Sequence, residues 1–514
     1  MTRKVLTMVL ALMLALTAIP AFTAGAESEE LPFVTLDWYF GLNEMNGDAA
    51  VQDAVNEYLL EKLNCNVNLH YWSGDSYWEK MTTMISAGQD CGIIGFGTQT
   101  KLDYVVQSQR GGYYPLDDML DTLAPDTKAL FSDEIWEAMK IDGHIYGIPS
   151  LKDNGYYISL IYNAEMAEEL GIDVDSLDFR GMRDLADVAY EVQEKRAASE
   201  KYAEYADYPV FWYAAGIFPY NFAFETFFNG QYFAVCNIDG INDIAGVDCD
   251  TVVNFYETPE FLDYAKQMQQ LVEDGIYLYD YDNKSEMQYT GGIFGWVGWG
   301  YTYMEEHMYG ENFTTKMKMF NRMWTDTGNF QSAGTAISAK CAEPERAMMI
   351  LNLINTDSKF ATMMRFGVEG THYTYDDEGK MTFAGTLNED PSNRDYYYWY
   401  AAPLGNLTIV NAPESLTGPD GIMLQNMVQY NKEAIVANHM GFVLDTTPIV
   451  NEVAACTNVV SEYQSDLQQG KASSQEEVEE LVAEFVEKLK ANGVDTIVAE
   501  TQSQIDAWNA AKAN

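Results

Sequence analysis

The sequence predicts an α/β protein built from two sheet-containing units. Three observations lead to this fold class. Strands and helices alternate over residues 34–123, the same alternation starts again over 145–171, and 47% of the 514 residues are hydrophobic. Alternating strands and helices favour parallel sheets covered by helices, and this share of apolar residues is ample for packed cores.

Residues 1–26 form an expected export signal. Arg3 and Lys4 precede an apolar run over 5–19, and Ala24 and Ala26 precede the first acidic residue, Glu27. This pattern is typical of a signal peptide cleaved after Ala26. The run is shorter than the ~20 residues of a spanning helix, and no later apolar stretch reaches that length. We therefore expect an exported protein, and no cysteine follows the cleavage site closely enough to carry a lipid.

The first unit shows a regular order of elements. A strand over 34–38 precedes a helix that Asp48 can cap, and apolar residues recur at helical spacing up to Leu63. A strand at 67–71, a helix at 76–87, a short buried strand at 93–94 and a helix at 116–123 follow. Ligands of such sheets bind beyond the carboxyl ends of the strands, which here are the loops at 38–40, 72–75 and 96–99.

The second unit and the C-terminal region continue the pattern. Strands are expected at 145–149 and 157–162, and helices at 164–171, at 259–274 and after Pro344. Ser474 and Glu477 fit a capping box at the start of a further helix, and Asp495 can cap a last helix that reaches about residue 508. With no repeat or low-complexity linker in the chain, we expect crossing strands to join the two units.

The charge excludes several classes of partner. The chain has 30 basic and 78 acidic residues, a net charge of −48, and removal of the signal leaves 28 basic residues and a charge of −50. An acidic body repels phosphate backbones and anionic bilayers. Nucleic-acid binding and membrane-surface docking are therefore poor interpretations.

Motifs for catalysis or metal binding are scarce. There is no GxSxG, GxxxxGK[ST] or GxGxxG motif, and the five histidines are scattered. The acidic groups at 280–283 and 376–378 lack EF-hand spacing and read better as solvated loops. We expect no catalytic residue, no metal and no cofactor, although 78 acids leave glycosidase chemistry open.

Six cysteines are present, none in a CxxC pair. Cys236 and Cys249 bracket a short polar loop and form the best disulfide candidate, with buried thiols as an equally good alternative.

Aromatic residues are the most informative group. Residues 291–303 read GGIFGWVGWGYTY, which interleaves glycines with Trp296, Trp299 and Tyr301. Glycine permits close backbone approach, and an indole offers a flat apolar face with a polar edge. A sugar ring has matching apolar faces and a rim of hydroxyls. Stacking on a carbohydrate is one interpretation, and core packing is the other.

Several segments together resemble a known family. They are 56–64 (NEYLLEKLN), 114–120 (YPLDDML), 145–149 (IYGIP) with 160–163 (LIYN), 332–338 (SAGTAIS) with 344–347 (PERA), and 441–456 (GFVLDTTPIVNEVAAC). In order and spacing they are similar to extracellular solute-binding proteins of family 1, the ligand-capturing components of bacterial ABC importers for sugars. The last segment resembles a long-chain subset with an extra C-terminal domain.

The resemblance implies a type II periplasmic-binding-protein-like fold, in which two α/β lobes close on a ligand by hinge bending. Lobe 1 would span 31–149 and lobe 2 would span 150–330. Residues 331–385 would return to lobe 1, and 386–514 would complete the lobes and end in helices. The resemblance also places Trp296 and residues 153–157 at the cleft. Members from single-membrane bacteria usually carry a lipid-anchored cysteine after the signal, which this chain lacks.

These inferences combine into one functional hypothesis. The protein is expected to bind a neutral carbohydrate of the oligosaccharide class and to deliver it as a monomer to a membrane permease without acting as an enzyme. The candidate ligand-binding residues are Trp38, Tyr39, Trp72, Thr98, Gln99, Asp153, Tyr156, Trp212, Trp296, Trp299 and Tyr301. Two alternatives remain: a peptide or amino-acid-derivative binder of the same fold, and an exported glycoside hydrolase.

Overall fold

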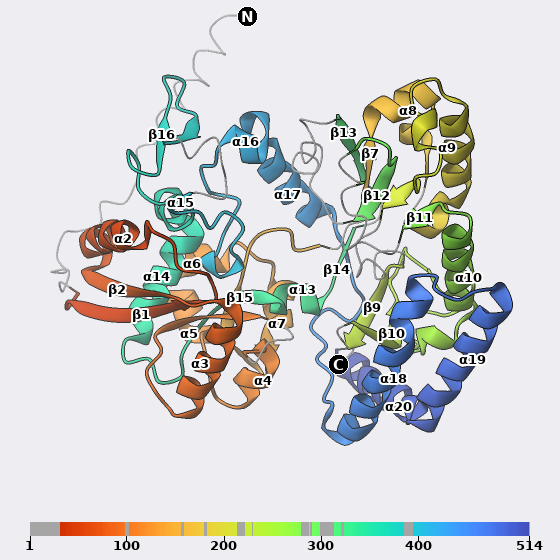
Figure 1. Ribbon diagram of the computed structural model, residues 1–514. Coiled ribbons are helices and arrows are strands. Elements are labelled where there is room, and N and C mark those ends of the chain that lie inside the picture. Colours follow the sequence, from red (N-terminus) through yellow and green to blue (C-terminus); the bar gives the residue numbers. More distant parts are fainter. Residues whose placement is uncertain are drawn as a thin grey trace, which may run out of the picture.

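Two α/β lobes lie side by side and are joined by crossing segments (Figure 1). The computed structural model describes residues 31–97, 102–155, 159–178, 182–212, 222–228, 230–278, 287, 290–298, 313–319, 323–384 and 394–512. Each lobe contains one five-stranded sheet with its own hydrophobic core.

Lobe 1 is built on a sheet of order β2-β1-β3-β15-β6. β1, β2 and β3 pair in parallel, whereas β15 runs antiparallel to β3 and to β6. In Figure 1, α2 lies above this sheet and α3 and α4 lie below it. The strands are β1 (Val34–Phe40), β2 (Cys65–Tyr71), β3 (Ile93–Gly97), β6 (Gly147–Pro149) and β15 (Ala333–Ile337). The helices are α2 (Asp48–Leu63), α3 (Gly74–Ser86), α4 (Tyr104–Gln109), α5 (Asp117–Thr122), α6 (Pro125–Lys128), α7 (Asp133–Ala138), α14 (Pro344–Thr356), α15 (Ser358–Phe366), α16 (Glu414–Thr417) and α17 (Ile422–Glu433). Two hairpins, β4 (Lys140–Ile141) with β5 (His144–Ile145) and β16 (Tyr373–Tyr375) with β17 (Met381–Phe383), complete the lobe.

The first strand is longer than the sequence suggested. β1 continues through Phe40, because Trp38 and Phe40 alternate with Tyr39 and point into the core next to Tyr71. The expected loop at 38–40 is therefore wrong, and these residues belong to the sheet.

Lobe 2 is built on a sheet of order β11-β8-β12-β7-β13. β8, β11 and β12 pair in parallel, and β7 runs antiparallel to both β12 and β13. The strands are β7 (Ser159–Asn163), β8 (Phe211–Trp212), β11 (Tyr277–Leu278), β12 (Gly295–Gly298) and β13 (Thr315–Met319). α8 (Ala164–Leu170), α9 (Ala186–Ala198), α10 (Pro259–Glu273) and a hairpin of β9 (Phe224–Phe228) with β10 (Gln231–Asn237) belong to the same lobe.

Three helices from the end of the chain complete lobe 2. α18 (Val450–Gln468), α19 (Gln475–Ala491) and α20 (Val494–Lys512) pack beside α10 (Figure 1), and their apolar residues share its core. The Ser474 hydroxyl caps α19 by accepting from the Glu477 N–H at 3.2 Å. The Glu477 carboxylate returns to the Ser473 N–H at 2.6 Å, one residue earlier than in the expected box. The last helix begins at Val494, one residue before the expected position of its cap at Asp495.

The two lobes are joined in three places. One connection leaves β6 at Pro149 and enters β7 at Ser159, and the second leaves β13 and returns through β14 (Trp324–Thr325) and α13 (Thr327–Gln331) to β15. The third leaves α17 through β18 (Ile435–Val436), which pairs in parallel with β14. This small sheet ties the second and third connections together.

The described cysteines are all thiols. Cys236 is buried in the core of lobe 2, and Cys249 lies on a loop without a sulfur partner. The expected Cys236–Cys249 disulfide is therefore wrong, and the alternative of unpaired thiols holds.

Candidate functional site

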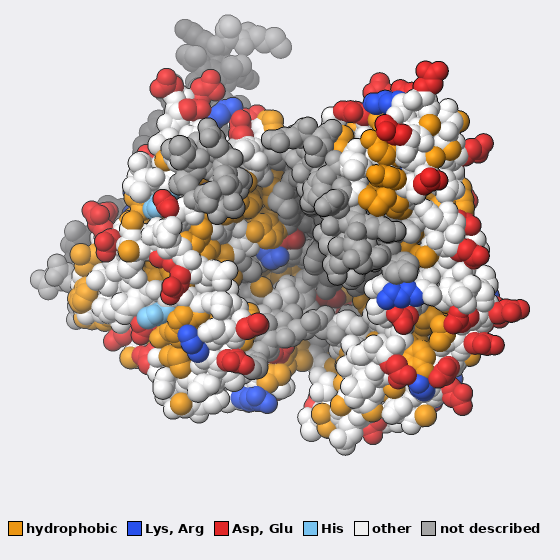
Figure 2. Space-filling view, viewed as in Figure 1, with side chains coloured by type: hydrophobic (Ala, Val, Ile, Leu, Met, Phe, Trp, Pro, Cys, Tyr) orange, Lys and Arg blue, Asp and Glu red, His pale blue; other side chains and the backbone are white. Residues whose placement is uncertain are grey.

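The carboxyl edges of the two sheets meet at the crossing segments. In lobe 1 the connection to lobe 2 leaves from the carboxyl end of β6 and returns at Ala333, which pairs with Gly97 at the end of β3. In lobe 2 it enters at Ser159, which pairs with Gly298 at the end of β12. Because ligands of open α/β sheets bind at such edges, the space between them is the candidate site. Figure 2 shows a notch between the lobes on this side.

A cavity of about 430 Å³ opens between the lobes. Lobe 1 contributes Asp103 and Val105 from the start of α4, and lobe 2 contributes Thr226 and Phe227 from β9. Residues of α13 and the 442–446 loop line the rest. Residues of both lobes line this cavity, so its shape depends on the position of one lobe relative to the other.

Asp153 is the sequence-predicted residue that the structure places most clearly at the crossing. Its carboxylate accepts from the Tyr400 hydroxyl at 2.5 Å and from Lys152 Nζ at 3.0 Å, with 11% of the side chain exposed. The Lys152 ammonium also lies 5.3 Å from the Tyr400 ring centroid. The result is a cluster of one acid, one cation and one ring that can offer both acceptors and donors to a polar ligand.

Hydrogen bonds from distant parts of the chain hold this segment in place. Asn431 on α17 accepts from the Asn154 N–H at 2.8 Å and donates to the Lys152 carbonyl. The Thr325 hydroxyl of β14 donates to the Asn154 carbonyl at 2.5 Å. The backbone that presents Asp153 is therefore fixed by both of the other connections.

The tryptophans of lobe 1 lie in different environments. Trp38 is 0% exposed and packs in the core, so its expected role as an open stacking platform is wrong. Tyr39 is buried and stacks on His70 at 4.4 Å, and burial together with Asp37 raises the pKa of Tyr39 to about 12. Trp72 is half-buried, with its ring 5.1 Å from Tyr39 and 4.4 Å from Lys80 Nζ. The structure thus brings Tyr39 and Trp72 together and sets Trp38 apart.

Trp296 lies in a small apolar cluster on one face of the lobe 2 sheet. It pairs in register with Ile161, which also pairs with Met317, and Phe313 completes the cluster. Its ring is 8% exposed. Packing of this kind favours the core interpretation for Trp296 over direct stacking.

The structure does not describe the side chains of the other candidates. Trp212 is the last residue of β8, and its side chain is outside the described set. Thr98, Gln99, Tyr156, Trp299 and Tyr301 lie outside the described residues. Thr98 directly follows β3 and Trp299 directly follows β12 in the sequence, so their roles at the site remain predictions.

Sequence reasoning missed an acidic cluster at the crossing. Glu225 on β9 is buried and accepts from His439 Nδ1 at 2.7 Å, while His439 Nε2 lies 3.1 Å from Asp250. Burial lowers the pKa of His439, but the bonds and charges of Glu225 and Asp250 outweigh it, so the net shift is upward. No sequence spacing could have predicted this cluster, because Glu225 is 214 positions and Asp250 is 189 positions from His439 in the sequence.

Asp326 belongs to the same region and caps α13. Its carboxylate accepts from the Asn329 N–H at 3.0 Å. Complete burial, followed by repulsion from Glu225, raises the pKa of Asp326 to about 7. Protonation of this carboxyl near neutral pH therefore changes the charge at the lobe junction.

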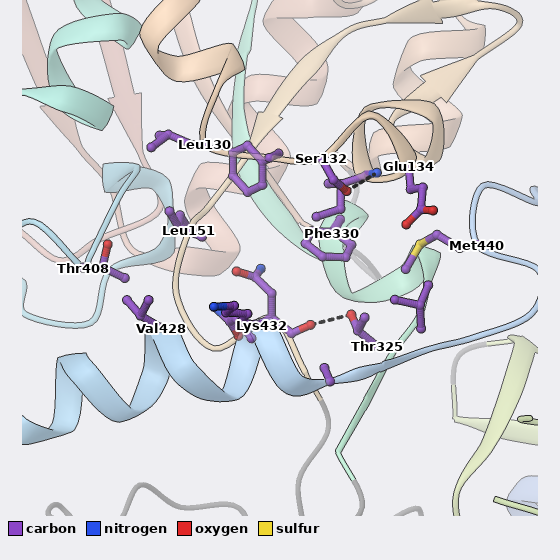
Figure 3. Close-up of a pocket in the computed structure, with 16 residues that line it drawn as sticks. Leu130, Ser132, Glu134, Leu151, Thr325, Phe330, Thr408, Val428, Lys432 and Met440 are labelled. Carbon is purple, nitrogen blue, oxygen red and sulfur yellow. Dashed lines mark hydrogen bonds between the residues drawn. The ribbon is translucent and has the colours of Figure 1, made fainter. Parts of the chain in front are cut away.

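A second cavity of about 490 Å³ lies inside the crossing itself (Figure 3). Val428 and Lys432 face it from α17, Phe330 from α13, Leu130 from the α6–α7 loop and Leu151 from the first connection. Its lining is mostly apolar and includes no residue from the sheet or helices of lobe 2. The cavity between the lobes is therefore the better candidate for a ligand that both lobes hold.

The described residues contain neither a metal-binding cluster nor a membrane-spanning helix. Within these ranges no group of three or more His, Cys, Asp or Glu side chains is arranged to hold a metal ion. None of the described helices combines the length and apolarity needed to cross a membrane.

Family models match most of the chain. A model described as bacterial extracellular solute-binding protein matches residues 53–372, and a domain of unknown function (DUF3502) matches residues 438–510. A carbohydrate ABC transporter substrate-binding protein from Streptococcus pneumoniae is 23% identical over 495 residues, covering 94% of this chain and 92% of that protein.

Solved structures show the same architecture. The N-glycan transport solute binding protein NgtS from Streptococcus pneumoniae aligns with a TM-score of 0.74 and 19% identity, covering 93% of this chain and 98% of that one. NgtS in complex with Man1GlcNAc gives 0.68 and 20%, covering 92% and 99%. An extracellular solute-binding protein from Bifidobacterium longum subsp. infantis gives 0.57 and 15%, covering 94% and 99%. These likenesses confirm the two-lobed α/β fold.

Proposed function

The chain belongs to the bacterial extracellular solute-binding protein family, and from this membership we propose that it captures a neutral oligosaccharide for an ABC importer. Members of this family work outside the cytoplasm, so the protein is exported. Binding would draw the two lobes together, since side chains of both lobes line the cavity between them.

The single observation that carries the proposal is the position of Asp153. This partly exposed carboxylate, joined to Tyr400 and Lys152, lies where the carboxyl edges of both sheets meet. A carboxylate accepts hydrogen bonds from sugar hydroxyls, and a tyrosine ring offers an apolar face to the ring of a sugar. The carbohydrate named for the relative from Streptococcus pneumoniae and the glycan bound to NgtS support this ligand class.

The remaining features of the function follow from the same proposal. Residues 1–26 would be removed as a signal peptide after Ala26, a segment outside the described residues. The mature protein would deliver its ligand to the permease as a monomer. We propose binding rather than catalysis as its task, with no nucleic-acid partner.

Calorimetric titration of the full mature chain tests the proposal. The panel contains neutral oligosaccharides of mannose and N-acetylglucosamine, other neutral glycans, and peptides of similar mass. We expect one class of neutral oligosaccharide to bind. Asp153→Asn should weaken that binding about tenfold or more, because hydrogen bonds to a charged group contribute about 1.5–3 kcal/mol. Tyr400→Phe should cost less, since it removes only the hydroxyl that orients the carboxylate.

A matched control distinguishes the loss of a ligand contact at Asp153 from a general change in the charge of the protein. Asp466→Asn removes an acid whose exposed carboxylate pairs with Lys471 on lobe 2, and it should leave affinity unchanged. Binding of peptides but of no glycan would replace this proposal with the peptide-binding alternative. Slow release of reducing sugar from a glycan, abolished by one carboxylate substitution, would identify a hydrolase instead.

A further inference from the structure

Four arginines are buried among the described residues, and one of them differs from the rest. Arg196 donates to the carbonyls of Pro209, Gly292 and Tyr208. Arg365 and Arg346 likewise donate to several backbone carbonyls. Arg394 is only 9% exposed, and no carboxylate among the described residues pairs with it. Its Nε, like those of Arg196 and Arg365, is buried without a hydrogen-bond partner, and its side chain bonds to the Tyr397 side chain.

Two aromatic rings, set at 68° to each other, contact the Arg394 guanidinium. Its Cζ lies 3.8 Å from the Phe383 ring centroid and 4.3 Å from that of Tyr397. Cation–π contacts stabilise a cation only modestly, whereas burying an ion without a counter-charge is strongly unfavourable. The rings orient the cation and shield it from water, but they do not replace an anion.

A cavity of about 510 Å³ lies next to this cation. It is enclosed by the β16–β17 hairpin and the 413–416 segment at the start of α16, and the Thr382 and Ser415 side chains line it. The other charges of its lining already have partners. Lys380 Nζ pairs with Glu414 at 2.8 Å, and the Asp376 carboxylate accepts from the backbone N–H groups of Glu378 and Lys380. Arg394 is thus the charge in this lining that no described counter-charge neutralises.

We propose that this cavity binds a single carboxylate carried by an otherwise uncharged small molecule, anchored by Arg394. A guanidinium is a planar fork of N–H donors, and a planar carboxylate fits that fork with two parallel hydrogen bonds. The two hydroxyls can bond to polar groups on the rest of the ligand. Asp376 and Glu414 lie in the same lining and repel dianions, which disfavours phosphate. The volume falls within the range of small-molecule sites.

This site is separate from the cleft between the lobes. The hairpin and α16 lie at the upper end of lobe 1 in Figure 1, away from β14 and the crossing, and the two cavities share no lining residue. The inference therefore goes beyond the proposed function and does not depend on it.

Titration of the full chain with D-glucuronate and D-glucose tests the inference, because the two probes differ in the carboxylate at one carbon. We expect glucuronate to bind and glucose to bind at least tenfold more weakly. Arg394→Met should reduce glucuronate affinity at least tenfold. Arg394→Lys keeps a positive charge but loses the fork, and it should also reduce affinity. Lys128→Met, which removes a cation of lobe 1 that pairs with Asp121 outside this lining, should change affinity less than threefold.

Near-ultraviolet circular dichroism first verifies that each variant is folded. If Arg394→Met does not fold, the glucuronate affinity of Arg394→Lys tests the inference, because this variant keeps a positive charge next to the two rings. Equal binding of both probes, absence of glucuronate binding, or full affinity in a folded Arg394 variant would overturn the inference. Tighter binding of inorganic phosphate than of glucuronate would overturn the assignment to a carboxylate.

Discussion

At the scale of single residues, two fully buried arginines position the loops around the candidate site. Arg365 on α15 donates to the carbonyls of Trp399, Ala401 and Leu404, and so fixes the segment that carries Tyr400. Burial lowers the pKa of Arg365 to about 9 and that of Arg196 to about 10. Each guanidinium satisfies carbonyl oxygens that would otherwise be buried without donors. Arg365 therefore acts on the site as a positioning residue, through Tyr400.

Asp326 predicts a pH dependence of stability. Its carboxyl has a pKa of about 7 in the folded protein, against 3.8 in the unfolded chain, so the folded state binds more protons between these values. Stability from this group is then highest at low pH and is lost as pH rises towards 7. Asp326→Asn should make the free energy of unfolding less dependent on pH between 4 and 7, as measured by urea denaturation at a series of pH values.

The asparagine in that variant can still cap α13, because Asn and Asp are comparable at this position. Asp103→Asn makes the same exchange at the more exposed cap of α4, where the carboxylate accepts from the Val106 N–H at 3.1 Å. Its pH profile shows whether an exchange of Asp for Asn at a helix cap alters the slope by itself. Parallel pH profiles for the parent and Asp326→Asn would show that Asp326 does not titrate in this range.

At the scale of elements, periodicity was a good guide to long helices and a poor one to short strands. The amphipathic stripe and the Ser474 cap predicted α19, and the alternation of 67–71 predicted most of β2. β14 and β18 are each two residues long and lie more than 100 residues apart in the sequence, so no local pattern could predict them. The predicted strand over 34–38 ends before β1 does, because three consecutive aromatic residues hide the alternation that is typical of a strand.

Some residues of the candidate site could likewise be predicted from the sequence, and others could not. Asp153 could be predicted because it follows a recognisable crossing strand. Tyr400, Asn431 and Glu225 could not, since they reach the crossing only through the folded arrangement of distant segments. A buried ring such as Trp38 looks the same in sequence as an exposed one, which explains the error there.

The C-terminal helices predict a strong effect of core truncation in α19. Phe485 is fully buried, with its ring 4.8 Å from Tyr256 and 5.3 Å from Tyr463. Phe485→Ala should destabilise lobe 2 by about 3–5 kcal/mol, because it removes a large side chain and leaves a cavity. Urea unfolding followed by circular dichroism measures this loss. Val450→Ala on α18, at an exposed position, should stay within about 0.5 kcal/mol. Similar stabilities for the two variants would contradict a shared core.

At the scale of the whole molecule, acidic side chains are spread over both lobes (Figure 2). With 78 acidic and 30 basic residues the surface carries a large excess of like charge. Such a body repels polyanionic ligands, whereas a neutral sugar experiences no net field. Ligand selection therefore falls to local groups such as Asp153 and its neighbours rather than to the overall charge.

The same charge predicts that salt stabilises the protein. Self-repulsion destabilises a compact, highly charged molecule, and the screening length falls from about 30 Å at 0.01 M to about 8 Å at 0.15 M ionic strength. The melting temperature should rise when sodium chloride is raised from 0.01 to 0.15 M, as scanning calorimetry measures. Sodium and potassium chloride should act alike. A melting temperature that falls with salt would mean that attractive ion pairs outweigh the repulsion.

The return of residues 450–512 to lobe 2 has a consequence for how the chain acquires its structure during synthesis. The ribosome releases every sheet strand and helix of lobe 1 before it releases α18–α20, whose apolar residues fill the core of lobe 2. Lobe 1 can therefore fold early, while α10 and β10 of lobe 2, which are synthesised much sooner, remain without the C-terminal helices that pack against them. A truncated chain that ends before α18 would contain all of lobe 1 but would expose apolar core residues of lobe 2. Proteases would cleave such a chain readily.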